Sequence, residues 1–575
     1  MPDHPQRFWL VAFFVAWTVD FLFWEKAPGI SFFVFTVLAL AGGYILARWE
    51  GKRPARLSLA LSGLILALAA VTVLRSEPFT RLINGFLALA CLGLLARTFR
   101  TGGWIHIRLL DYLIIGLDLV IAGLGRAVSL PLAPADQPGS PRKRLFGQIL
   151  PVVRGLLLAL PVVILLAALL SSADLVFADR LDSLLTNFQL DQLPEYFLRL
   201  FFILILAYLF AGLYLQAVLP VKSLAALWGD EQVFVARSSP AADMEKDSSN
   251  APDPAAAADK DPGGEGNLTR TTDSSIGAAQ TAVREVGGRF LGAIESFIIL
   301  GSVNLLFIFF VAIQFRYLFG GQNNITSAGY TFSEYARQGF FELVWVAVIS
   351  LLLYVVLDSI THRRSAAHQR AFSGLSLLLV GLVLVILVSA FQRLLLYEDA
   401  YGFTRLRTYT HVFIPWLGFL LTATMALQLV RRERLLGTLL LLTAIGFALT
   451  FGVLNIDGMI ARQNVARAQA GLSLDGAYLL GLSDGALPDL VRAFEQPEQL
   501  PGVRDTLGAV LACRVYRLST GEAQPWQSYH PGQAVARQAL GGVNLASYPV
   551  RGADSRAYVD LDGEQFDCYP PAGID

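Results

Sequence analysis

The sequence predicts an all-α, multi-pass membrane protein, and three features of the 575-residue chain support this fold class. Hydrophobic residues make up 55% of the chain and charged residues only 16%, whereas soluble domains carry about 25% charged residues. The mean hydropathy is +0.54, with the polar stretches included. Apolar runs of about 20 residues, the length needed to cross about 30 Å of hydrocarbon, recur along the chain. A soluble globule has no interior large enough for this much apolar surface, so lipid must solvate part of the protein.

Charge balance and cysteine content exclude several other protein classes. Lys+Arg and Asp+Glu are both 45, so the formal net charge is zero. This balance excludes a polybasic nucleic-acid binder and an acidic disordered chain, and we expect no nucleic-acid partner. Three cysteines are too few for a disulfide-dense scaffold or a cysteine-rich zinc module. The partner that composition does imply is the lipid bilayer.

Eleven segments are predicted to cross the membrane. They lie at 8–24, 29–47, 57–74, 82–96, 149–171, 199–219, 293–315, 340–357, 371–392, 412–430 and 435–454.

Residues 109–130 are almost apolar enough to be a twelfth span, but Asp111 and Asp118 lie seven residues apart on one helical face. A crossing there would move Arg142-Lys143-Arg144 to the other side and invert every later loop. We therefore expect 109–130 to be an interfacial or partly re-entrant helix on the cytoplasmic side.

Basic residues predict the orientation of the spans. They concentrate in alternate loops, as Arg48, Lys52, Arg53 and Arg56; Arg97, Arg100 and Arg108; Arg142, Lys143 and Arg144; Arg363, Arg364 and Arg370; and Arg431, Arg432 and Arg434. Loops rich in Lys and Arg stay in the cytoplasm. The N-terminus is therefore expected in the cytoplasm and the C-terminus outside it.

The same patterns divide the chain into four regions. Residues 1–220 form an N-terminal membrane region of six spans plus the interfacial helix, and residues 221–292 form a cytoplasmic linker. Within the linker, 237–289 is rich in Ala, Asp, Pro, Gly and Ser, and is predicted to be disordered because it cannot bury a core. A second membrane region of five spans covers 293–454, and 455–575 is a small extracytoplasmic domain. That domain is predicted to be mostly helical, with helices at 460–471, 484–494, 506–518 and 533–540, and strands at 557–561 and 564–569 around a hairpin turn.

Two polar stretches, 329–343 and 393–407, are the most distinctive candidates for a functional site, and both are expected at the outer interface. Ionisable side chains at such depth are costly unless they are paired or hydrated. The candidate cluster comprises Glu334, Arg337, Glu342, Arg393, Glu398, Asp399, Arg405 and Arg407. Plausible pairs are Glu342 with Arg393, and Glu334 or Glu398 with Arg405 or Arg407. These charges either staple helix ends together or line an access point for a proton, an ion or a lipid headgroup.

Motif searches predict no catalytic residue, no cofactor and no metal site. The six histidines form no HExxH motif, no serine sits in a GxSxG elbow, and the glycine-rich 263–266 lacks the Lys-Ser/Thr of a phosphate loop. Cys513 and Cys568 both fall in the predicted outer domain, where the environment can be oxidising. We expect these two cysteines to form a disulfide.

Four sequence blocks resemble a known family. They are RGLLLALPVVILLAALLSSADLVFA, GYTFSEYARQGFFELV, LLLYEDAYGFTRLRTYT and NIDGMIARQNVARAQAGLSLDGAYLLGLSDGALPDL. They resemble the bacterial multi-pass membrane family filed as domain of unknown function 4173, which is close to family 4153. The resemblance covers roughly residues 140–535 with the linker as an insertion, and the segment that often begins Asn-Pro-Asp in the family is Asn455-Ile456-Asp457 here. It implies a bacterial cytoplasmic (inner) membrane location and a span pattern, but no activity, substrate or catalytic residue.

Three hypotheses of function remain open at this point. The favoured one is a non-enzymatic envelope sensor, scaffold or regulatory partner that contacts other proteins through its linker and outer domain. The second is a transporter or channel-like protein that uses the charges at the outer interface. The third is a membrane enzyme acting on a lipid-linked substrate, with Glu334, Glu398 or Asp399 as general base. The lack of a catalytic constellation leans against the enzyme.

Overall fold

The structure, a computed structural model, describes most of the predicted spans and most of the C-terminal region. The described residues are 4–106, 193–218, 293–318, 340–361, 365–432, 435–521, 524–552, 556–561 and 563–570. Several predictions fall outside them: the span at 149–171, the interfacial helix at 109–130, the disordered linker at 237–289, and the site residues Glu334 and Arg337.

Ten described helices are long and apolar enough to cross a membrane, so the chain is an all-α polytopic membrane protein. Each of them overlaps one of the eleven predicted spans. They are α1 (Pro5–Phe23), α2 (Ile30–Trp49), α3 (Arg56–Leu74), α4 (Pro78–Thr98), α8 (Leu193–Val218), α12 (Ala293–Leu318), α15 (Phe340–Ile360), α16 (Ala366–Tyr401), α17 (Arg405–Leu429) and α18 (Leu436–Val453). A short 3-10 turn, η1 (Gly103–His106), follows α4.

Helix α16 is longer than its predicted span. Its 36 residues correspond to about 54 Å at about 1.5 Å per residue, well beyond the hydrocarbon thickness. The first part of the polar stretch at 393–407, which follows the predicted span at 371–392, is helical up to Tyr401. Gly402 then ends the helix with φ +83°, a left-handed conformation that glycine adopts without strain.

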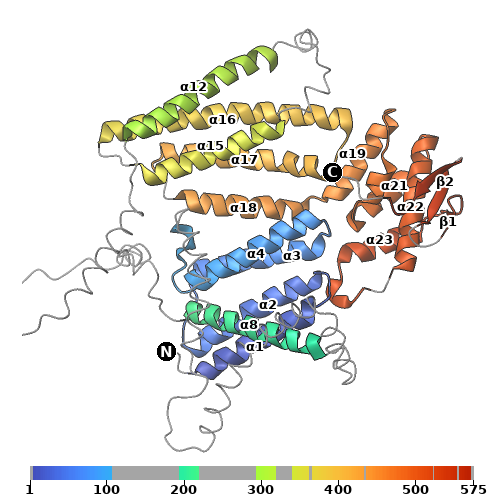
Figure 1. The fold of residues 1–575 in the computed structure, drawn as a ribbon, viewed down its shortest axis with the longest axis horizontal. Helices are drawn as coiled ribbons and strands as arrows, with labels where there is room; N and C mark the ends of the chain where they lie inside the picture. Colours follow the sequence, from blue (N-terminus) through green and yellow to red (C-terminus); the bar gives the residue numbers. More distant parts are fainter. Residues whose placement is uncertain are drawn as a thin grey trace, which may run out of the picture.

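The spans lie side by side in a layered bundle, and α18 joins its two halves (Figure 1). Helix α1 packs on α8, α3 packs on α4, and both α12 and α15 pack on α16. Helix α18 contacts α17 on one side and α3 and α4 on the other. Its residues Ile445 and Ala448 belong to the hydrophobic core of the N-terminal helices. Helices α3 and α18 approach closely at Gly452, where an added Cβ would lie 2.5 Å from Val71 Cγ2. Only glycine fits at this position.

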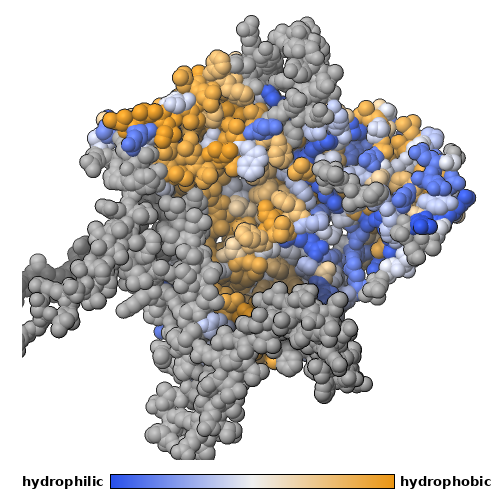
Figure 2. All heavy atoms as spheres, viewed as in Figure 1, coloured by the Kyte–Doolittle hydropathy of each residue, from blue (hydrophilic) through white to orange (hydrophobic). Residues whose placement is uncertain are grey.

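The outward surface of the bundle is apolar, as a lipid-facing surface must be. Figure 2 shows hydrophobic residues over the exposed helices and hydrophilic residues gathered on the C-terminal region. Large side chains such as Leu82, Phe86, Leu305 and Phe309 are exposed on the helices. Contiguous apolar exposure of this extent is untenable in water, so hydrocarbon must cover it.

Residues 455–570, which we call the C-terminal module, are mostly helical with a small sheet. The elements are α19 (Ile456–Gln469), α20 (Gly476–Leu480), η4 (Asp484–Ala486), α21 (Leu487–Phe494), α22 (Pro501–Thr520), η5 (Trp526–Ser528), α23 (Pro531–Gly541), β1 (Val550–Arg551), β2 (Tyr558–Leu561) and β3 (Glu564–Asp567). The four predicted helices and the predicted hairpin are present. Helix α20 and strand β1 were not predicted, because each is too short to show a periodic pattern.

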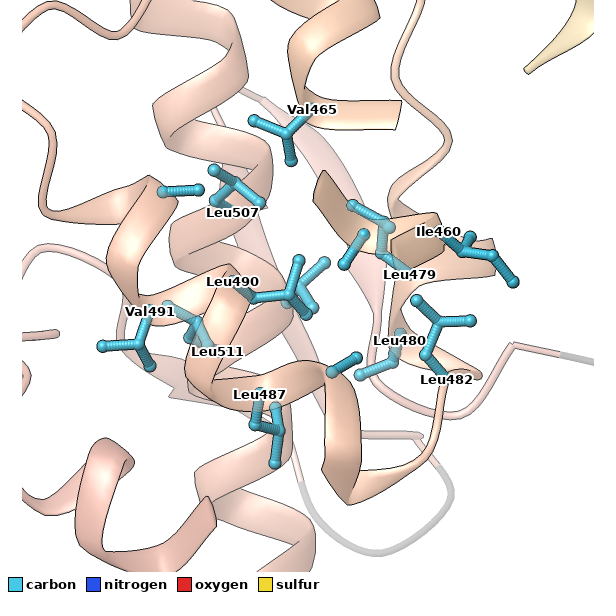
Figure 3. Packing of buried hydrophobic residues seen from close by; sticks show 14 of the residues in the cluster. Ile460, Val465, Leu479, Leu480, Leu482, Leu487, Leu490, Val491, Leu507 and Leu511 are labelled. Carbon is cyan, nitrogen blue, oxygen red and sulfur yellow. The ribbon is translucent and has the colours of Figure 1, made fainter. Parts of the chain in front are cut away.

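Helix α22 forms the centre of the module core. Leu507 and Leu511 of α22 pack with Leu490 of α21 and with Leu479 at the end of α20 (Figure 3). The sheet is antiparallel in the order β1-β2-β3, and Val559 of β2 points into the same core. The module therefore has its own hydrophobic core, which is continuous with the end of α18 through Phe447 and Phe451.

Candidate functional site

The C-terminal module sits on one end of the helix bundle, and we call the contacts between them the joint (Figure 1). On the module side, the joint uses 455–489 and 526–530. On the membrane side it uses the turns at 27–30 and 399–405 and the residues 73–77, which cover the end of α3 and the segment before α4. Both membrane regions therefore hold the same module.

A buried ion pair between Arg405 and Asp457 lies at the centre of the joint. Asp457 is fully buried, with 0% of its side chain exposed. Arg405 donates from Nε to Oδ1 over 2.9 Å and from Nη2 to Oδ2 over 2.7 Å, and the backbone N–H of Ser483 donates to Oδ2 over 2.6 Å. This bidentate, charge-assisted ion pair is strong, and it fixes the relative orientation of the two side chains. It locks the first turn of α17 onto the first turn of α19.

The local sequence explains why both groups stand at helix starts. The Thr404 side chain accepts a hydrogen bond from Arg407 N and caps α17, which puts Arg405 in the first turn. The Asn455 side chain accepts one from Gly458 N and caps α19, which puts Asp457 in its first turn. Polar caps of this kind fix where a helix begins. Arg405 also donates from its backbone N to Tyr478 Oη over 2.7 Å, which ties α20 to the same point.

The turn between α16 and α17 is held by two side chains of α19. Asn464 donates to the Phe403 carbonyl and accepts from the Phe403 N–H, each over 2.8 Å. Arg467 donates to the carbonyl of Asp399 over 2.8 Å and to that of Ala400 over 3.0 Å, which satisfies acceptors at the end of α16. A Cβ on Gly402 would lie 2.6 Å from Arg467 Nη1 and 2.9 Å from Asn464 Oδ1, so one added there would displace these two side chains.

Glu398 pairs with a histidine and not with either arginine considered from the sequence. Its Oε2 lies 2.8 Å from His411 Nδ1, and the Glu398 side chain is only 1% exposed. The contact links the end of α16 to the second turn of α17. Glu398 Oε1 is buried and has no hydrogen-bond partner among the described residues. A buried carboxylate beside an imidazole can hold or exchange a proton.

Of the other predicted cluster residues that the structure describes, two contribute to the joint and two do not. Arg407 donates to the carbonyls of Tyr401 and Gly402 and lies 4.0 Å from the centre of the Tyr397 ring. Asp399 exposes its side chain and contributes its carbonyl to Arg467. The remaining two lie apart from the joint contacts: Glu342 is exposed in the first turn of α15, and Arg393 is buried in α16. Glu334 and Arg337 lie outside the described residues.

Asp457 and Glu77 lie in the joint although neither was predicted as a site residue from the sequence. Glu77 stands directly before α4 with its side chain only 1% exposed, and its Oε2 has no hydrogen-bond partner among the described residues. Burial, together with the negative charge of Asp457, raises the pKa of the Glu77 carboxyl above its ordinary value, against a smaller lowering by Arg75. Acidic residues at the start of α4 and α19 were visible in the sequence, but only the fold brings them together.

The second half of the joint attaches the module to the N-terminal helices. Ser528 donates from Oγ to the Ala27 carbonyl over 2.8 Å, and Ile30 N donates to the Tyr529 carbonyl over 3.1 Å. A Cβ on Gly29 would lie 2.6 Å from the Ser528 backbone carbon. His530 Nδ1 lies 3.1 Å from the Val73 carbonyl, and burial lowers the pKa of His530, so a neutral ring donates this bond at pH 7.

Cys513 and Cys568 are joined by a disulfide in the structure. Both side chains are fully buried, their Cα atoms are 5.0 Å apart, and they are separated by 55 residues in sequence. The bond ties α22 to the end of β3. Arg517 donates from Nε to the Cys568 carbonyl over 2.7 Å, which reinforces the same connection. Among the described residues, no group of three or more His, Cys, Asp or Glu is placed to hold a metal ion.

Comparison with known proteins assigns a family. A family model described as Domain of unknown function (DUF4153) matches residues 62–493, which is more than half of the chain. The chain belongs to this family. In this DUF4153 protein, the matched range includes Arg405, Asp457 and the contacts of Asn464 and Arg467. The disulfide and the 526–530 segment lie beyond it. No curated protein and no solved structure matches the chain.

Proposed function

We propose that this DUF4153 protein is a non-enzymatic membrane scaffold or regulatory partner that presents its C-terminal module to other envelope proteins. The observation that carries the proposal is the Arg405–Asp457 bond at the joint. This arginine, one of the charges expected to line a transport site, bonds to Asp457 and so holds the module on the bundle. Contacts of the module with both membrane regions fix its orientation, which suits a surface that other proteins recognise.

The location follows from the same arrangement and from charge. We place the protein in a bacterial cytoplasmic membrane with its module outside the cytoplasm. In support, Arg48 and Arg97 lie at the ends of α2 and α4 that are opposite to the joint. The linker at 237–289 is then a cytoplasmic segment open to a further protein partner.

Site-specific photo-cross-linking in living cells tests the scaffold function. A photoreactive amino acid at Leu500, which is exposed on the module, should give a discrete protein adduct. The same amino acid at Phe309, on the lipid-facing surface of α12, is the matched control and should give none. Weakening the joint with Asp457→Asn should reduce the Leu500 adduct because the module loses its fixed orientation. Absence of any module adduct would overturn the proposal.

A proton- or ion-handling function is the second candidate, and the Glu398–His411 pair favours it. Ionisable groups within membrane helices are costly and usually serve a function. Glu398 has one buried carboxylate oxygen without a hydrogen-bond partner among the described residues. The test is ion flux in liposomes that contain the purified protein. Flux that is present in the wild type and absent in Glu398→Gln would replace the scaffold proposal, whereas no flux in either would support it.

A further inference from the structure

A column of aromatic rings runs along the outward face of α1 and ends on the C-terminal module. Phe14, Trp17 and Phe21 occupy one helical face at spacings of three and four residues. Ring centroids are 6.3 Å apart between Phe14 and Trp17, 5.8 Å between Trp17 and Phe21, and 6.3 Å between Phe21 and Trp526. Trp526 belongs to η5 of the module, 505 positions further along the chain than Phe21.

These rings share the same surroundings. Phe14, Trp17 and Phe21 are 49%, 46% and 42% exposed, and Trp526 is 55% exposed. The opposite face of α1, with Phe8 and Val15, is buried in the bundle. The exposed face of a membrane-spanning helix is in contact with lipid, so Trp526 continues a lipid-facing surface.

Neighbouring groups mark the depth of Trp526. Helix α1 ends at Phe23, and Lys26 follows with its Nζ bonded to the Phe21 carbonyl over 2.7 Å and 5.1 Å from the centre of the Phe21 ring. Lysine side chains near the ends of membrane helices keep their charged group in the headgroup layer, so Lys26 indicates the boundary between hydrocarbon and headgroups. Trp526 contacts the same Phe21 ring and therefore lies at this boundary. The indole of tryptophan prefers this layer, since its ring is apolar and its N–H can bond to headgroups or water.

Two hydrogen bonds to the turn between α1 and α2 hold this segment at the boundary. Ser528 bonds to the Ala27 carbonyl, and the Tyr529 carbonyl accepts from Ile30 N, so 526–530 lies directly on the turn between α1 and α2. Tyr529 is also exposed at this level. We propose that Trp526, with Tyr529, seats the C-terminal module in the interfacial layer of the bilayer, with phospholipid as the occupant of this surface.

The proposal makes the bilayer a direct partner of the module, in addition to the helices that anchor it. The module then rests on three supports: the Arg405–Asp457 pair, the 526–530 segment on the α1–α2 turn, and the lipid around Trp526. It is independent of which proteins the module binds.

Depth-dependent fluorescence quenching tests the proposal in the full-length protein. Trp526→Cys, in a Cys91→Ala background with the native disulfide intact, is labelled with an environment-sensitive NBD dye and reconstituted into phosphatidylcholine–phosphatidylglycerol vesicles. A lipid with a nitroxide near its headgroup should quench the dye strongly, and aqueous iodide should quench it weakly. The matched control is Gln565→Cys, at an exposed position of β3. The sheet that contains β3 lies on the side of the module away from the spans (Figure 1).

We expect lipid quenching at 526 to exceed that at 565 several-fold, with iodide showing the reverse order. Equal iodide quenching at the two positions would overturn the proposal. If Trp526→Cys does not yield a monodisperse protein, Tyr529→Cys carries the same dye at the same level. Its lipid quenching and its iodide quenching are then each compared with those at 565, with the same expected and contradicting results.

Discussion

At the scale of single residues, the joint depends on one fully buried carboxylate whose partners are all donors. Asp457 accepts from two guanidinium nitrogens of Arg405 and from the Ser483 N–H. A buried pair of this kind adds little over a well-packed apolar pair, but removing one charge is strongly destabilising because the other stays behind. The Arg405–Asp457 pair therefore contributes mainly to the orientation of the module, and the loss of one of its two charges should be easy to measure.

Asp457→Asn should lower the stability of the purified protein by about 3 kcal/mol. The asparagine amide would place an N–H group against donors, while Arg405 would lose its counter-charge. Asp560→Asn is the matched control, because Asp560 pairs with Arg551 on the exposed sheet over 3.3 Å and should change stability by less than about 1 kcal/mol. Thermal unfolding in detergent measures both. Equal midpoints for the two variants would contradict the central role of Asp457.

The stability of the protein should depend on the protonation of Glu77. The pKa of this carboxyl is raised in the folded protein, so the folded state binds the proton more tightly than the unfolded state. The neutral Glu77 carboxyl therefore stabilises the folded protein, and this stabilisation is fully present below the ordinary carboxyl pKa of roughly 4.3. It is lost as the pH rises through the raised pKa of Glu77 in the folded state.

Glu77→Gln should remove this part of the pH dependence and stabilise the protein relative to wild type at neutral pH. Unfolding midpoints of wild type and Glu77→Gln, followed from acid to neutral pH, should therefore diverge as pH rises. Glu564→Gln, at an exposed position of β3, serves as the control and should follow the wild type. Parallel curves for Glu77→Gln and wild type would refute the role of Glu77.

At the scale of elements, the long helix α16 and its glycine end determine where α17 and α19 meet. Gly402 has a left-handed backbone and lies against Arg467 and Asn464 of α19. The helix must stop there for Thr404 to cap α17 and for Arg405 to face Asp457. Backbone conformation at one glycine thus sets the position of two side-chain contacts.

Gly402→Ala should destabilise the protein by about 1–3 kcal/mol, through strain at positive φ and through the collision with Arg467. Gly381→Ala is the matched control within the same helix, where nothing lies within 4 Å of the added Cβ. Alanine inside a helix is more favourable than glycine by about 0.5–1 kcal/mol, so the control should be neutral or stabilising. The midpoints of thermal unfolding distinguish the two variants. A Gly402→Ala midpoint equal to that of the wild type would show that the turn adapts to alanine.

The disulfide between Cys513 and Cys568 is the covalent link between α22 and β3. Closing a loop of 55 residues restricts the unfolded module and is worth about 4 kcal/mol in the entropic account. The Cys513→Ser, Cys568→Ser double variant should therefore unfold at a lower temperature than the wild type. Mass spectrometry of protein purified without reductant should show the linked peptides, and two free thiols there would disprove an oxidised module. Cys91→Ser, at a buried position in α4, provides the unlinked control.

At the scale of the whole molecule, one module caps both membrane regions, and α18 lies between them. Contacts from the 526–530 segment reach the N-terminal helices, and contacts from α19 reach the C-terminal helices. Separation of the two regions would have to break these contacts and the core around α18. The architecture therefore favours a single rigid unit over two halves that move independently.

The orientation of this unit leads to a binary prediction. Paired fusions at the C-terminus, one active only outside the cytoplasm and one fluorescent only inside, should report an outside location. The same pair placed in the basic loop after α2, near Lys52, should report inside and controls for insertion. An inside result at the C-terminus would mean that the span count changes by one, with 109–130 as the extra span, and would make an oxidised Cys513–Cys568 pair implausible.

The sequence predicted the positions of the helices well but the contacts between side chains of different elements poorly. Span positions depend on local hydrophobicity, so each described span overlaps its predicted segment. The pair of Arg405 depends on a residue 52 positions away in another element, and sequence offered only Glu334 and Glu398 as partners. Glu77 was overlooked because a single acidic residue at a helix start has no pattern, and only its burial beside Asp457 gives it importance.

By itself, the sequence determined that lipid is the solvent of this protein, where its helices run, and which two cysteines can meet in the C-terminal region. These properties follow from hydrophobicity summed along short segments and from residue content. Only the tertiary structure decided that Arg405 and Asp457 meet at the centre of the joint, and that Trp526 continues the aromatic column on the exposed face of α1. Such contacts join positions up to about 500 residues apart, and their energy depends on burial and geometry that no local pattern contains.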